Sequence, residues 1–122
     1  MDEYAIGELR EANDALSDVD ELRKVDVTDK LIVNRLYYAC FHAARAALHT
    51  RGFDPTSHQG VISLFGREIV KKGDASGDDG RFLNEMRTYR TTADYEHEPL
   101  DVDVNALYER TKTFVSDMEA LA

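Results

Sequence analysis

The chain has 122 residues, which suits a single domain, 1–122, built around one hydrophobic core. Its formal net charge of −9, from 24 acidic and 15 basic residues, argues against a broad nucleic-acid-binding surface but leaves room for a local basic site. The single cysteine, Cys40, excludes an internal disulfide, and we find neither a signal peptide nor an apolar run of roughly 18 to 20 residues. We therefore expect a cytoplasmic protein without a membrane segment.

The first half of the chain predicts two long helices. Residues 3–24 carry apolar side chains at offsets of three and four in a polar background, which indicates an amphipathic helix. Thr28 or Asp29 can cap a second helix over 29–51, which ends at Gly52. Because this second helix is apolar around most of its circumference, we expect it to lie at the centre of the domain, with Cys40 as a buried thiol.

The polar positions of the central helix follow one line at offsets of 3, 4, 3 and 4: Arg35, Tyr38, His42, Arg45 and His49. Polar groups on a buried helix need partners, so this stripe requires an explanation. It is either an edge that faces solvent or a second subunit, or one wall of a cleft that binds an anion.

The second half predicts three more helices. Asp54–Ser57 is a turn that caps a shorter third helix, stopped by Gly73, and His58 at its start is expected to be structural or solvent-facing. Residues 73–80 are predicted to form a flexible acidic loop, which does not match a calcium loop because Asp79 stands where glycine is required. A fourth helix follows, with His97 in its last turn before Pro99, and Asp101 or Asp103 caps a fifth. The expected fold class is all-α, an up-and-down bundle of four long helices plus one shorter helix.

The fourth helix carries a charged face formed by Arg87, Arg90, Asp94 and His97. The simple interpretation is an ion pair between Arg90 and Asp94, with His97 near the helix C-terminus. The functional interpretation is that arginine binds a phosphate and histidine moves a proton, which together suffice for cleavage of an RNA phosphodiester without a metal or another cofactor. Since about 10 Å of helix axis separates Arg90 from His97, either the arginine reaches along the face or a second subunit completes the site.

Two segments resemble the HEPN domain family. One is Asn34-Arg-Leu-Tyr-Tyr-Ala-Cys-Phe-His-Ala-Ala-Arg-Ala-Ala-Leu48, which is similar to the central-helix signature of small stand-alone members. The other runs from Arg87 through Arg90 and Tyr95 to His97 and resembles the family's motif of Arg, four to six residues and His. Six residues lie between Arg90 and His97, and the order Tyr95-Glu-His97 reverses the His-x-Tyr order of members controlled by adenylylation.

The resemblance implies a homodimer with metal-independent endoribonuclease activity, and in many members a toxin paired with a minimal nucleotidyltransferase as antitoxin. It places Arg90 on the scissile phosphate and His97 as general acid or base, with Asp94 orienting one of them. The expected substrate-binding residues are Arg87, Tyr95, Arg35, Tyr38, His42 and Arg45. The alternative is a non-catalytic module that binds a nucleotide or docks a partner protein.

Overall fold

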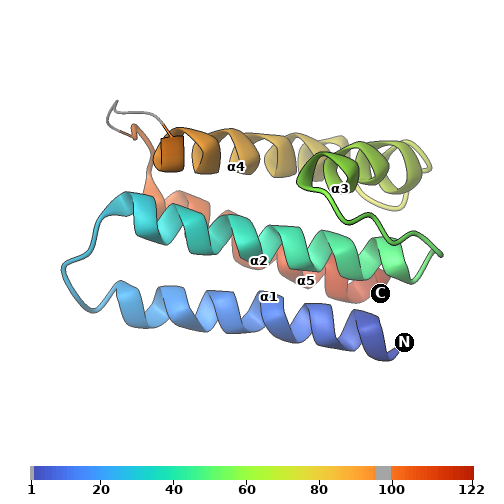
Figure 1. Cartoon of the computed structure of the whole chain (residues 1–122), viewed down its shortest axis with the longest axis horizontal. Helices are drawn as coiled ribbons and strands as arrows, with labels where there is room; N and C mark the ends of the chain where they lie inside the picture. Colours follow the sequence, from blue (N-terminus) through green and yellow to red (C-terminus); the bar gives the residue numbers. More distant parts are fainter. Residues whose placement is uncertain (1, 96–99) are drawn as a thin grey trace.

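The structure is a computed structural model that describes residues 2–95 and 100–122. The described residues are helical with connecting turns and contain no strand, as the sequence predicts. The elements are α1 (Glu3–Leu22), α2 (Asp29–His49), α3 (His58–Leu64) with the π-helical turn η1 (Phe65–Val70), α4 (Gly77–Tyr95) and α5 (Val104–Leu121). Neighbouring long helices run up and down the bundle, with α1 on one side of α2 and α4 on the other (Figure 1).

Polar side chains fix where the helices begin. Thr28 caps α2 by accepting a hydrogen bond from the Leu31 amide, at 3.3 Å, and Asp103 caps α5 through the Ala106 amide, at 3.1 Å. Ser57 does the same for α3. Each cap satisfies an amide that has no partner inside the helix, so these predicted starts are confirmed.

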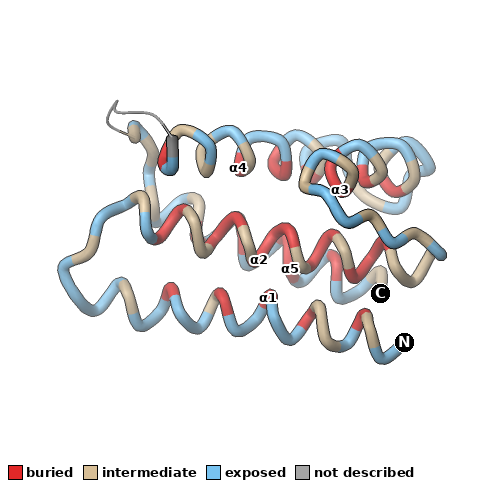
Figure 2. The backbone as a smooth tube through the Cα atoms, in the orientation of Figure 1, coloured by how far each residue is buried: buried red, intermediate tan, exposed pale blue. Residues whose placement is uncertain are grey.

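Helix α2 forms the centre of the domain because it is apolar on almost every side. It packs against α1, α4 and α5, and Figure 2 shows its backbone as the most continuously buried of the bundle. Tyr37, Leu36 and Leu48 are fully buried within it, as is Cys40. Ala5 of α1 and Ala46 of α2 lie in one buried cluster, and such small side chains let two helices approach closely.

Two parts of the third and fourth helices differ from the prediction. The predicted loop over residues 73–80 is wrong in its second half, because α4 already begins at Gly77. The hydroxyl of Ser76 accepts a hydrogen bond from the Asp79 amide at 3.0 Å, and this cap starts the helix among residues that the sequence pattern assigns to a loop. The third helix also changes from α to π geometry at Phe65, which its apolar spacing does not reveal.

Candidate functional site

The predicted ion pair on the fourth helix is present. Arg90 and Asp94 lie one turn apart on α4, with 2.9 Å between Arg90 Nε and Asp94 Oδ2. Their side chains keep 21% and 26% of their exposure, so the pair is partly shielded from water. Asn34 of α2 donates a 3.5 Å hydrogen bond to the same Asp94 oxygen and links the pair to the central helix.

Two tyrosines of α2 hold the Arg90 guanidinium. Its central carbon lies 5.9 Å from the ring centre of Tyr37 and 5.8 Å from that of Tyr38, and Arg90 Nη2 donates a 3.4 Å hydrogen bond to the Tyr38 hydroxyl. The faces of aromatic rings attract cations, and a planar guanidinium stacks on them well. The structure therefore brings together two of the predicted site residues, Tyr38 and Arg90, from helices distant in the sequence.

His58 belongs to the same group, although its position in the sequence predicts only a structural or solvent-facing role. Its Nδ1 lies 2.6 Å from the Tyr37 hydroxyl, and its ring stacks on Phe41 with 4.4 Å between ring centres. Burial lowers the pKa of His58, and the positive charges of Arg90, Arg87, Arg45 and His42 lower it further. Burial also raises the pKa of Tyr37 to about 12.

In the sequence, the one feature that sets His58 apart is its position at the start of a helix. Ser57 caps α3 and places His58 in its first turn. Which helix this turn contacts depends on the tertiary fold. The contact with Tyr37 spans 21 residues of sequence, so no local pattern could predict it.

The polar stripe on α2 divides into two parts. Arg35 lies with Tyr38 near Arg90, its guanidinium carbon 5.1 Å from the Tyr38 ring centre and one nitrogen 3.9 Å from Asp18. The rest of the stripe turns towards α1.

Carboxylates in and just before the first two turns of α1 form ion pairs with the side chains of this second part. His42 Nδ1 lies 2.7 Å from Glu8 Oε2, and Arg45 lies 3.9 Å from the other Glu8 oxygen. Arg45 also donates a hydrogen bond to the Tyr4 hydroxyl, and His49 pairs with Asp2 at 3.1 Å. The structure thus places His42 and Arg45 in a polar seam between α1 and α2, next to the Arg90 group rather than within it.

Arg87 lies beside the group on α4. It donates a hydrogen bond to the side chain of Gln59, the residue after His58. These two residues line an open groove of about 400 Å³ together with Asn84, Thr88, Thr91 and Thr92. A groove with one cation and several hydroxyls next to Arg90 could hold a phosphate-bearing chain.

The structure does not describe the side chains of two predicted site residues. His97 lies outside the described residues, and Tyr95 is described only as the last residue of α4. The assignment of His97 as an acid or base and of Tyr95 as a binding residue therefore remains a prediction.

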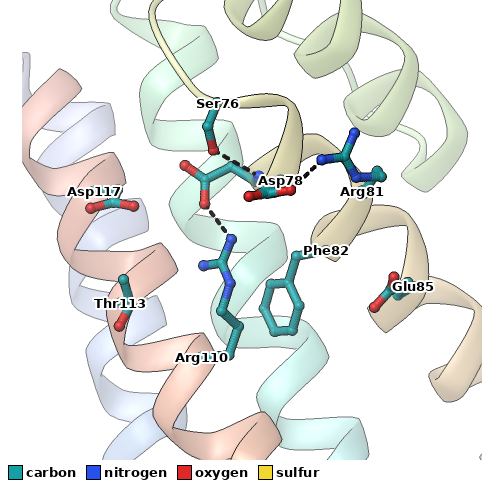
Figure 3. Close-up of a pocket in the computed structure, with 9 residues that line it drawn as sticks. Ser76, Asp78, Arg81, Phe82, Glu85, Arg110, Thr113 and Asp117 are labelled. Atoms are coloured by element: carbon teal, nitrogen blue, oxygen red, sulfur yellow. Dashed lines mark hydrogen bonds and ion pairs between the residues drawn. The ribbon is translucent and has the colours of Figure 1, made fainter.

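A larger hollow, about 500 Å³, lies between the first turns of α4 and the middle of α5 (Figure 3). Arg110 reaches across it from α5 to Asp79, at 2.7 Å, and the Asp79 side chain is only 6% exposed. Asp79 is thus used in an ion pair that joins two helices. Over residues 2–95 and 100–122, His, Cys, Asp and Glu side chains form no group of three that could hold a metal ion.

Comparison with known proteins identifies the family. The model of the HEPN domain matches residues 7–121, which is almost the whole chain. The chain belongs to the HEPN domain family. The resemblance seen in its two motifs is therefore confirmed. Within the described part of this HEPN domain, no helix is long and apolar enough to cross a membrane.

Related proteins come from bacteria and archaea. A "UPF0332 protein" of Thermotoga maritima is 38% identical over 86 residues, which cover 70% of this HEPN domain and 64% of the relative. Two proteins of Methanocaldococcus jannaschii are each named "Putative toxin". One is 36% identical, with 52% of this chain and 44% of the relative covered. The other is 32% identical, with 88% and 87% covered. The chain thus spans less than two thirds of the length of the first two relatives.

Proposed function

We propose that this HEPN domain is a metal-independent endoribonuclease and the toxin of a pair whose antitoxin is a minimal nucleotidyltransferase. The observation that carries the proposal is the placement of Arg90 in the C-terminal part of α4, where Asp94 and two tyrosine rings hold it and further cations lie nearby. Such a guanidinium is already oriented to receive a phosphate. The toxin names of two relatives support the biological role.

The proposed reaction needs only side chains. A general base takes the proton of the RNA 2′-hydroxyl, whose oxygen attacks the neighbouring phosphorus. The bond from phosphorus to the 5′-oxygen breaks, and a general acid supplies a proton to that oxygen. His97 carries one of these proton transfers, while Arg90 stabilises the charge that builds up on the phosphate oxygens. The products are a 2′,3′-cyclic phosphate and a free 5′-hydroxyl.

The test is cleavage of a labelled RNA by the purified protein in the presence of EDTA. We expect wild-type cleavage to persist without divalent metal, and Arg90→Ala or His97→Ala each to lower the rate at least about 100-fold. Arg81→Ala is the matched control, because Arg81 is an exposed arginine at the other end of the same helix. Absence of wild-type cleavage, or cleavage that both substitutions leave unchanged, would contradict the proposal.

A docking module is the second candidate, because the Arg90 and Asp94 side chains already satisfy one another. In that case the same surface binds the nucleotidyltransferase without cleaving RNA. Co-purification of the two proteins distinguishes the candidates. A complex that survives Arg90→Ala combined with His97→Ala, from a protein that cleaves no RNA, favours docking.

A further inference from the structure

The start of α3 is packed into the corner between α2 and α4, and this position gives His58 its surroundings. Phe41 covers one face of the imidazole, and Tyr38 meets it edge-on with 6.0 Å between ring centres. Since Arg90 lies over both tyrosines that contact His58, the imidazole and the guanidinium share one aromatic support. The support holds both groups in place without neutralising either.

The charges around His58 are positive, in a chain whose net charge is −9. Arg87 and Arg90 face it from α4, and Arg45 and His42 face it from α2. Carboxylates already pair with three of these groups: Asp94 with Arg90 on α4, Glu8 of α1 with His42 and Arg45, and Asp54 with Arg45. Arg87 contacts the neutral side chain of Gln59 and pairs with no carboxylate in the part of the chain that the structure describes, so the side of His58 that faces Arg87 favours an anion.

The hydrogen bond to Tyr37 engages Nδ1 of His58 and leaves Nε2 for a ligand. Burial raises the pKa of Tyr37 to about 12, so its hydroxyl keeps its proton at neutral pH, and in one of the two imidazole tautomers it donates to Nδ1 of His58. The neutral imidazole then carries its own proton on Nε2. This half-exposed ring makes no other hydrogen bond among the residues that the structure describes.

We propose that His58 binds a backbone phosphate of single-stranded RNA through Nε2, together with Arg87 and Arg90. The three side chains come from α3 and α4: Arg87 lines the groove of about 400 Å³, and Gln59 and Thr91, the residues after His58 and Arg90, line it too. The inference rests on the proposed function for its choice of RNA as the ligand. It adds a binding residue from α3, which the motif on α4 does not contain.

The first test is an NMR titration of the histidine ring signals of the full-length protein. The probe is a hexauridylate with 2′-O-methyl groups, which binds as RNA but lacks the hydroxyl that attacks. We expect the pKa of His58 to lie below that of an ordinary histidine in the free protein and to rise when the probe saturates the site, because a bound phosphate favours the charged imidazole. An unchanged His58 pKa at saturation would overturn the proposal.

The second test measures binding of the same probe by fluorescence anisotropy. His58→Phe keeps the ring on Phe41 but removes both nitrogens, and we expect roughly tenfold weaker binding. His49→Phe is the matched control, because His49 also stacks on an aromatic ring, that of Tyr4 at 4.1 Å, and also bonds through Nδ1, to Asp2. Equal affinity of the wild type and His58→Phe would overturn the proposal.

Two further arms separate the sources of phosphate and the two proposals. Inorganic phosphate and uridine monophosphate should shift the His58 pKa only at much higher concentrations than the hexauridylate; equal potency would overturn the assignment to an RNA backbone.

His97→Ala should retain the shift of the His58 pKa on binding the hexauridylate, since binding does not require the proton transfer. If the wild type cleaves RNA while His58 stays unshifted, the inference fails alone. If His58 shifts and no RNA is cleaved, the proposed nuclease function fails and the binding residue stands.

Discussion

At the scale of single residues, Cys40 shows how burial controls chemistry. The thiol is fully buried in α2, and burial raises its pKa to about 12. Since the thiolate is the reactive form, we expect Cys40 to resist iodoacetamide in the native protein at neutral pH and to be alkylated once guanidinium unfolds the chain. Mass spectrometry of the intact protein measures both states. Native alkylation at the rate of a free cysteine would contradict this expectation.

Asp117 gives a prediction about pH. Burial raises its pKa, and the neighbouring negative charge of Asp79 raises it further. The folded state therefore holds the Asp117 proton more tightly than the unfolded state does, so this group lowers the stability as pH rises above the ordinary carboxyl value of 3.8. We expect Asp117→Asn to raise the free energy of unfolding at pH 7, by about 0.5 kcal/mol because the site is largely open to water. Below the ordinary carboxyl value the difference should vanish.

Urea unfolding at pH 7 and at pH 3 measures this difference. Glu109→Gln is the control on the same helix, since it removes the same charge from a side chain that is 68% exposed. We expect it to change the stability little at either pH. A stabilisation by Asp117→Asn that is equal at both pH values would show that the carboxylate charge is not its cause.

His58 and Cys40 mark the limit of prediction for residues. The burial of Cys40 follows from its place in an apolar run on a helix that is apolar on most sides, which is local information. The partners of His58 lie on α2 and α4, and its character depends on cations that the sequence does not place beside it. Sequence patterns therefore miss the functional role of a residue whose chemistry comes from tertiary neighbours, even when they predict its secondary structure.

At the scale of elements, the seam between α1 and α2 is electrostatic as well as apolar. Glu8 is 12% exposed and accepts from His42 at 2.7 Å, with Arg45 at 3.9 Å. We expect Glu8→Gln to lower the free energy of unfolding by about 1 to 2 kcal/mol, because two polar side chains of α2 lose a charged acceptor in a shielded position. Urea unfolding followed by circular dichroism measures the loss. Glu11→Gln, at an exposed position on the same helix, should cost much less.

Helix starts were predictable where a cap precedes an apolar pattern, as at Thr28 and Asp103. The start of α4 was not, because Gly77, Asp78 and Asp79 favour a loop by composition. The Ser76 cap and the ion pair of the buried Asp79 with Arg110 overcome this local preference. The contact with α5 lies 31 residues away, so the helix start depends on the folded bundle.

At the scale of the whole molecule, the amphipathic patterns predicted an all-α bundle with α2 at its centre, and the structure confirms both. The patterns work because each helix buries one face, except α2, whose buried residues lie on most of its sides. The site was predictable only in part. Arg90 and Asp94 pair within one helix, as helical spacing requires, whereas the tyrosines beneath them come from another helix.

A homodimer, which the resemblance to HEPN proteins implies, leads to a prediction about how a site is assembled. A helix that continued to His97, as the sequence pattern predicts, would separate it from Arg90 by about 10 Å along the axis, so we propose that each site combines Arg90 of one subunit with His97 of the other. Arg90→Ala and His97→Ala proteins, unfolded and refolded together in equal amounts, should then regain about a quarter of the wild-type activity. Half of the dimers formed by random pairing are mixed, and one of the two sites in each mixed dimer carries both side chains. If one subunit supplied both residues, every site in the mixture would lack one of them, and the cleavage rate would stay at the level of the separate variants.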